Sequence, residues 1–365
     1  MKIQHPVYYG DYLQLPKILN AQAPESQKYG KPAHDETLFI IIHQTYELWF
    51  KQILHELNSI REIMNKSYVP STDLSIINSR LERITTIQQI LIDQIHVMET
   101  MTSLDFMEFR DYLVPASGFQ SLQFRLVEAT LGIKPQHRME VEKQFFTSRL
   151  KKEDLETLQA EEQKISIFEL LEIWLARMPF SQFKGFDFWG AYATAVDHML
   201  KQDYEIISNN PGLSETMRSI ELKNLEATKE TFKVLLDANK FREYQTQGRV
   251  RLSQKAMLSA VFIHLYRDYP ALQMPFKILN SLVEVDEKFT TWRYRHAIMV
   301  QRILGTKIGT GGSSGHEYLK NTTERNRAFI DLFNLATFLI PKNAIPRLPE
   351  TIREQLDIVY DNLNS

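Results

Sequence analysis

Hydrophobic residues recur along this chain with the three- and four-residue spacing of amphipathic helices. The clearest stripe follows Asp73 and is broken only by the polar Gln88; it comprises Leu74, Ile77, Leu81, Ile84, Leu91, Ile95 and Met98. Such a stripe predicts packing inside a helix bundle and carries no chemistry of its own. Asp35 and Asp73 are of a residue type that caps helices, so we expect Asp35 to precede a helix over 37–64 and Asp73 to precede the next one.

The same periodicity predicts most of the remaining chain to be helical. Further helices are expected over 165–178, 188–207, 252–266, 275–304 and 324–339, with a charged helix opened by Pro211 and running to about Ala238. The alternating pattern of strands does not recur. We therefore predict an all-α fold, a single domain over 1–365 built as a large helical bundle. A more polar stretch over about 131–163 is expected to be a helical insertion.

Composition narrows the classes of function. A net charge of −2 gives no electrostatic reason to expect nucleic acid or an anionic membrane as a partner. The complete lack of cysteine excludes disulfides, thiolate zinc sites and cysteine nucleophiles, and it fits a reducing cytoplasm. No run approaches the roughly 20 apolar residues of a membrane span, and the first residues lack the apolar core of a signal peptide.

Glycine is concentrated in one place. Four of the 13 glycines fall within 309–315, directly after the predicted helix that carries His296. Bare backbone of this kind can approach a bulky ligand closely, although many such segments are plain surface connections. A phosphate-binding loop is the weaker alternative, because no Gly-Lys-Ser/Thr follows and the preceding element is a helix.

Two histidines lie on predicted helices with aromatic or basic neighbours. His43 follows Phe39 by four residues, so the two side chains share one helix face. That pair suits either the wall of a flat apolar pocket or ordinary core packing. His296 ends the run Trp292-Arg-Tyr-Arg-His296, and a neutral imidazole is a good axial ligand for haem iron.

A third segment joins an aromatic side chain to a guanidinium. Phe106 and Arg110 are again four residues apart, and an arginine beside an aromatic ring can bind a carboxylate while the ring packs the rest of a ligand. The alternative is an ion pair from Arg110 to Asp105 or Glu108. The following Pro-Ala-Ser-Gly, residues 115–118, is expected to end the helix and place Ser117 in a turn.

Together these segments resemble the tryptophan 2,3-dioxygenase family of helical haem enzymes. The resemblance runs nearly end to end, and its middle, about 135–250, is the weakest part. It rests on YGDYLQL (9–15), HDETLFIIIHQTYELWFKQIL (34–54), METMTSLDFMEFRDYLVPASGFQSLQFRLVE (98–128), WRYRHAIMVQRILGTKIGTGGSSG (292–315) and DLFNLATFLIP (331–341). It implies that the helical bundle encloses a haem pocket.

The resemblance implies a role for each matching residue. His296 would be the axial ligand of haem iron, and Ser117 would lie near the haem edge. His43 would be the catalytic distal histidine, hydrogen-bonded to the indole N–H, with Phe39 and Phe106 packing the indole. Arg110 would bind the substrate carboxylate, and Thr310 its ammonium and carboxylate end. The remaining implied contacts come from residues 1–30 of a neighbouring subunit in a homotetramer: Tyr9, Tyr12 and Leu13.

The implied reaction is cleavage of the indole C2–C3 bond of L-tryptophan by O₂, with haem b in its ferrous form, giving N-formyl-L-kynurenine at the start of the kynurenine pathway. Two alternatives stay open: a haem-binding sensor or carrier without turnover, and a dioxygenase for another indole amino acid. Two positions depart from the expected pattern. His316 replaces an expected aromatic residue, and Phe106 stands where some bacterial relatives carry tyrosine. We expect these two departures to affect the affinity for the substrate, and neither changes the proposed haem ligand.

Overall fold

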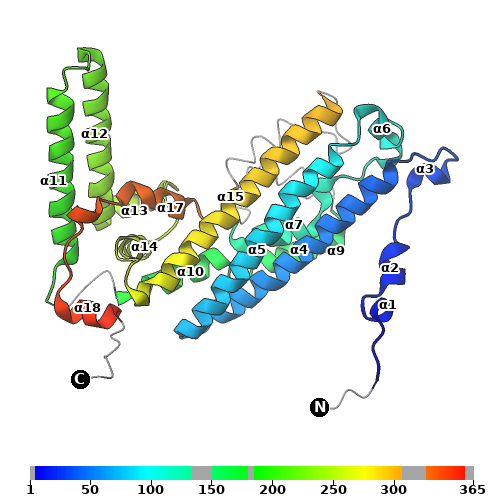
Figure 1. The fold of residues 1–365 in the computed structure, drawn as a ribbon, viewed down its shortest axis with the longest axis horizontal. Helices are drawn as coiled ribbons and strands as arrows, with labels where there is room; N and C mark the ends of the chain where they lie inside the picture. Colours follow the sequence, from blue (N-terminus) through cyan, green and yellow to red (C-terminus); the bar gives the residue numbers. More distant parts are fainter. Residues whose placement is uncertain (1–4, 134–149, 180–184, 306–325, 358–365) are drawn as a thin grey trace, which may run out of the picture. The chain divides into compact units, whose positions relative to one another are not determined.

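A computed structural model describes residues 5–133, 150–179, 185–305 and 326–357. Every regular element within these ranges is an α- or 3₁₀-helix, and they contain no β-strand (Figure 1). The predicted all-α class is therefore confirmed. None of the described helices combines the length and the apolar character that crossing a membrane requires.

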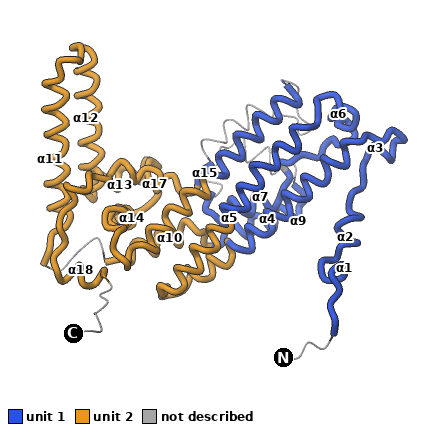
Figure 2. Tube along the Cα trace, viewed as in Figure 1, with its two compact units in different colours: residues 1–56, 84–164, 287–327 blue, residues 57–83, 165–286, 328–365 orange. Residues whose placement is uncertain are grey.

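Contacts divide the chain into two compact units (Figure 2). The first comprises residues 1–56, 84–164 and 287–327, and the second residues 57–83, 165–286 and 328–365. Three long helices contribute residues to both: α4 (Glu36–Met64), α5 (Ser71–Met98) and α15 (Pro270–Leu304). A single domain over 1–365 and a polar insertion stay predictions, since this division tests neither.

The first unit packs parts of α4, α5 and α15 around one apolar cluster. Ile42 of α4, Ile95 of α5 and Met299 of α15 are all buried there. Two other helices, α7 (Leu122–Leu131) and α9 (Lys152–Glu162), pack through Ala129 and Leu158. The shorter elements of this unit are α1 (Tyr9–Tyr12), α2 (Leu15–Leu19), α3 (Glu25–Lys28), α6 (Ser103–Met107), η1 (Arg110–Leu113) and η2 (Gly118–Gln120).

The second unit contains the hairpin of α11 (Phe188–Asn209) and α12 (Glu215–Leu236), labelled in Figure 1. Its α10 (Ile167–Ala176) begins with a capping box between Ser166 and Glu169, which satisfies the free amides of the first turn. Its other elements are α13 (Ala238–Thr246), α14 (Gln254–Leu265), α17 (Ile330–Phe333), η5 (Asn334–Phe338), η6 (Lys342–Ala344) and α18 (Glu350–Leu356).

Several predicted helix boundaries were wrong for local reasons. The charged helix begins at Glu215, because the Ser214 hydroxyl accepts from the Met217 amide, and Pro211 lies outside it. Helix α15 begins at Pro270, so Pro275, where the helix was expected to begin, lies inside it. The helix expected over 324–339 is replaced, among the described residues, by the short α17 and the 3₁₀-helix η5.

Candidate functional site

Phe39 and His43 lie one turn apart on α4, with ring centroids 4.1 Å apart. His43 Nδ1 lies 2.7 Å from the carbonyl oxygen of Phe39. A carbonyl can only accept, so Nδ1 carries the proton and Nε2 of the neutral ring keeps a lone pair. Burial lowers the pKa of His43 against the opposing effects of this hydrogen bond and of Glu47, so the ring is neutral near pH 7.

Phe106 joins this pair from a distant part of the sequence. It lies on α6, where its ring centroid is 5.8 Å from that of Phe39. Phe109, fully buried, completes the group with centroids 5.5 Å from Phe39 and 5.3 Å from Phe106. Edge-to-face and tilted contacts at these distances are favourable for aromatic rings. The structure thus brings Phe39, His43 and Phe106 together in one aromatic cluster.

Arg110 is the first residue of η1, immediately beyond this cluster. Its side chain is 19% exposed, and its Nη1 lies 3.3 Å from Oδ1 of Asp111, whose side chain is 84% exposed. An ion pair with so exposed a partner holds the guanidinium weakly. Asp105, one of the alternative partners considered from sequence, closes the capping box of α6 with Thr102. Hydrogen bonds from Thr102 lower the pKa of Asp105.

His296 lies on α15 and stacks on Trp292, one turn earlier. The ring centroids are 5.4 Å apart and the planes are parallel within 1°. Trp292 in turn contacts Phe124, with centroids 5.2 Å apart, and Tyr46, at 5.9 Å. Burial lowers the pKa of His296 to about 4, and nearby His43 adds to the lowering. Two neutral imidazoles therefore lie within electrostatic range of each other.

Buried ion pairs fix α15 close to His296. Glu128 of α7 accepts from Arg125 Nη1 and from Arg293 Nη2, both at 2.8 Å. Arg293 also donates from Nη1 to the carbonyl oxygen of Asn326, 2.8 Å away. All four residues are buried. Because Arg293 precedes His296 by less than one turn, this network restrains the rotation of α15 at the candidate iron ligand.

Of the remaining predicted residues, some lie in the described ranges and some outside them. Ser117 lies between η1 and η2, where its amide donates to Oε1 of Gln120 at 3.1 Å. Tyr9 and Tyr12 of α1 are 74% and 75% exposed, and Leu13 is partly buried. Thr310, the surrounding glycines and His316 lie outside the described residues.

Sequence reasoning gave no role to Trp292 or Phe109. Trp292 was detectable, because it precedes His296 by four residues, the same spacing that linked Phe39 to His43. Phe109 offered a similar signal, because it follows Phe106 by three residues, whereas its contact with the distant Phe39 had none.

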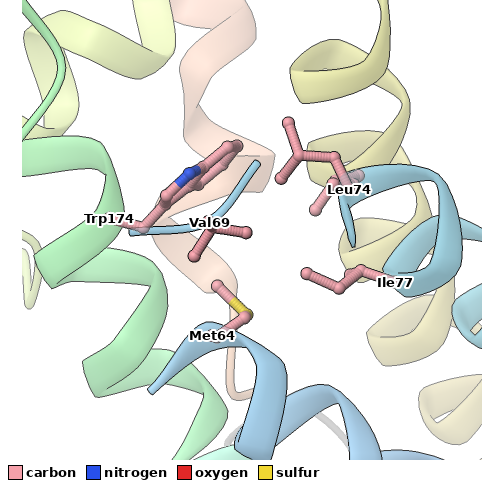
Figure 3. A pocket seen from close by; sticks show the side chains of 6 residues that line it. Met64, Val69, Leu74, Ile77 and Trp174 are labelled. Atoms are coloured by element: carbon pink, nitrogen blue, oxygen red, sulfur yellow. The ribbon is translucent and has the colours of Figure 1, made fainter. Parts of the chain in front are cut away.

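An apolar hollow in the second unit is separate from these residues. It is lined by Met64, Val69, Leu74, Ile77, Trp174 and Ile278. Figure 3 shows the labelled side chains around it, including Leu74 and Ile77 of the stripe predicted to serve packing alone. Its lining offers no carboxylate, imidazole or guanidinium to orient a ligand, so we assign no chemistry to it.

Comparison with known proteins covers nearly the whole chain. Residues 2–339 match the family model described as tryptophan 2,3-dioxygenase. A tryptophan 2,3-dioxygenase of Alteromonas mediterranea is 53% identical over 351 residues, which are 96% of this chain and 97% of that relative. One of Dictyostelium discoideum is 50% identical over 361 residues, covering 99% and 90%, and one of Bdellovibrio bacteriovorus is 48% identical over 356 residues, covering 97% and 99%. With a family match of this extent and identities this high over full length, the chain belongs to the tryptophan 2,3-dioxygenase family.

Proposed function

We propose that this chain is a haem-dependent dioxygenase that cleaves the C2–C3 bond of L-tryptophan with O₂ and yields N-formyl-L-kynurenine, the first step of tryptophan catabolism. Its family membership supports this activity. The structural observation that carries the proposal is His43, whose Nδ1 is engaged by the Phe39 carbonyl. Its Nε2 is thereby an acceptor beside aromatic rings, a combination that matches the N–H and the flat face of indole.

His296 is the residue that we propose as the ligand of haem iron. Its depressed pKa of about 4 supports this role, because the neutral imidazole is the form that binds iron. The parallel ring of Trp292 restrains the imidazole on one side. Haem supplies the activation of O₂ when it is bound, and the protein supplies position and surroundings. Ser117, in the turn fixed by Gln120, is proposed to lie near the haem edge.

The other residues are proposed to hold and orient L-tryptophan. Phe39 and Phe106 would pack the indole and exclude water, and His43 Nε2 would accept from the indole N–H. Arg110 would bind the carboxylate through its planar fork. Thr310, outside the described residues, is proposed to contact the ammonium and carboxylate end. The indole itself reacts with activated oxygen, so His43 needs only to orient it and no strong base is required.

We also propose a homotetramer in which the N-terminal segment of one subunit covers the site of another. The exposure of Tyr9 and Tyr12 supports this, because the chain's own residues leave about three-quarters of each aromatic residue in water. Light scattering that gives only the single-chain mass of 42.8 kDa would contradict it. A cytoplasmic location stays a prediction from sequence.

One experiment tests the proposed function directly. The purified, reduced protein is examined for a Soret band, and L-tryptophan is then added under O₂ while the absorbance of N-formylkynurenine is followed. We expect both signals. A Soret band without product would favour a haem sensor or carrier, and product from another indole amino acid alone would favour a different substrate.

Arg110→Ala is expected to leave the Soret spectrum intact and to weaken L-tryptophan binding by about 2–5 kcal/mol, because the buried carboxylate loses its charged partner. Arg110→Lys should recover only part of this, since an ammonium cannot form the bidentate fork. Steady-state kinetics give KM, and tryptamine, which lacks the carboxylate, serves as the control ligand. An unaltered KM for L-tryptophan in the alanine variant would refute the carboxylate role.

His43→Ala is expected to keep haem and to lower dioxygenation by about 10²-fold or less, as for modest misplacement of a substrate. If His43 were an obligatory base, the variant would instead lose its activity completely, and the pH profile of the wild type would follow the ionisation of His43. His264→Ala is a matched control. His264 is also partly buried on a helix and bonded through Nδ1 to the carbonyl four residues earlier, Ala260 O at 2.9 Å, but it belongs to the second unit.

A second measurement on the same variants uses 1-methyltryptophan, which has no indole N–H. The wild type should discriminate against it through the lost hydrogen bond and through crowding against the imidazole. His43→Ala removes both causes and should shrink the discrimination, whereas His264→Ala should not. Equal discrimination by His43→Ala and the wild type would place the indole nitrogen elsewhere.

A further inference from the structure

Two tyrosines distant in sequence stack beside the candidate carboxylate-binding residue. The rings of Tyr29 and Tyr112 lie 4.7 Å apart between centroids, with planes 12° from parallel. Tyr112 belongs to η1, which begins with Arg110. Tyr29 directly follows α3 and is 63% exposed, so its ring covers Tyr112 from the solvent side without entering the core. This stack joins η1 to the loop of residues 25–36, whose helix α3 also contacts η1.

The loop that carries Tyr29 is anchored on α4. The carboxylate of Glu36, which is 1% exposed, accepts from the amides of Glu25 at 2.7 Å and Ser26 at 3.0 Å. Ser26 Oγ accepts from the Ala33 amide at 3.0 Å. These bonds tie both ends of the loop together at the start of the helix that carries Phe39 and His43. Tyr29 therefore projects from a support whose position is set by the same helix as the indole-binding residues.

The segment that carries Arg110 has less support of its own. Helix η1 has only four residues, and no side chain caps its start. A 3₁₀ segment this short gains little from its own hydrogen bonds and depends on tertiary contacts for its position. On its inner side, Tyr112 and Leu113 pack against the core cluster that contains Phe106 and Phe109. The Tyr29 ring supplies the contact on the other side.

We propose that Tyr29 is a positioning residue for substrate specificity: by stacking on Tyr112 it holds η1 so that the Arg110 guanidinium is pre-positioned for the carboxylate of the amino-acid substrate. This inference rests on the proposed function of Arg110. An aromatic stack is worth an equilibrium shift of about 2- to 12-fold. Without this stack, η1 must become ordered when the carboxylate binds, and that ordering lowers the affinity for the carboxylate. The contacts with the indole are unaffected.

The test is a double-mutant cycle on the haem-loaded protein. Tyr29→Ala should raise KM for L-tryptophan by about 3- to 10-fold with kcat little changed, since the reacting groups stay in place. Inhibition by tryptamine, which lacks the carboxylate, should not change. Tyr29→Phe keeps the ring and should restore the wild-type KM. In the Arg110→Ala background, Tyr29→Ala should have no further effect on KM.

Tyr68→Ala is the matched control, because Tyr68 is an exposed tyrosine, 75% exposed, in the second unit. The inference is overturned by an unchanged KM in Tyr29→Ala, by an equal loss of L-tryptophan and tryptamine binding, or by an equal effect with and without Arg110. If the wild type binds L-tryptophan without turnover, the proposed activity fails and Kd replaces KM in the same cycle. If the wild type does not bind L-tryptophan at all, both proposals fail.

Discussion

His296→Ala is expected to yield a folded protein that does not retain haem and has no dioxygenase activity. Alanine cannot form an Fe–N bond. Trp292, the ring stacked on His296, has no basic nitrogen with which to replace it. The fold should survive, because His296 is only partly buried while α15 is anchored separately by Arg293. The substitution should therefore abolish haem binding while the helix bundle stays folded.

Haem content per chain and the Soret spectrum measure this loss, and far-UV circular dichroism checks the helices. His264→Ala, at a partly buried histidine of the second unit, should retain haem. Free imidazole, small enough to enter the space left by the side chain, should restore part of the haem binding to His296→Ala. Recovery of His296→Ala with full haem and an unchanged Soret band would show that another residue holds the iron.

Local periodicity predicted the long helices well because their buried faces are set by residues within one or two turns. The stripe from Leu74 to Met98 is an example: it predicted α5, which begins at Ser71, two residues before the expected cap. Helix ends were harder to predict. Ser214 and Pro211 both resemble starts, and only the hydrogen bond from the Met217 amide distinguishes them. Pro275 was expected to begin a helix and instead lies inside one.

Some contacts of the candidate site could be predicted from local sequence spacing, and others could not. The pairs Phe39–His43 and Trp292–His296 follow from helical spacing and were accessible from sequence. The contacts Phe39–Phe106, Tyr29–Tyr112 and Glu128–Arg293 join segments far apart in the chain, and no local pattern specifies which distant partner is chosen. The resemblance to the family identified His296 and Arg110, but it did not indicate what holds either one in place.

The Glu128 carboxylate shows how strongly one such distant contact can matter. Glu128→Ala is expected to lower the free energy of unfolding by about 3–5 kcal/mol, because it leaves the buried Arg125 and Arg293 guanidiniums close together without the carboxylate between them. Glu128→Gln should also be strongly destabilising, since it keeps the shape and removes the charge. Urea unfolding, compared through the midpoint at constant m, gives the change.

Glu230→Ala is the matched control for that measurement. Glu230 also pairs with two cations, with Oε1 2.6 Å from Lys240 Nζ and Oε2 3.7 Å from Lys233 Nζ, but its side chain is 45% exposed. Water solvates both lysine ammonium groups after the substitution, so only a small change is expected. Arg293 is also less than one turn from His296, so Glu128→Ala should weaken haem retention at urea concentrations where the helices are still formed, whereas Glu230→Ala should not. Equal unfolding midpoints for the two alanine variants would mean that the buried carboxylate contributes no more than a surface ion pair, and that other contacts of α15, such as the bond from Arg293 to the Asn326 carbonyl, hold it beside the candidate haem site.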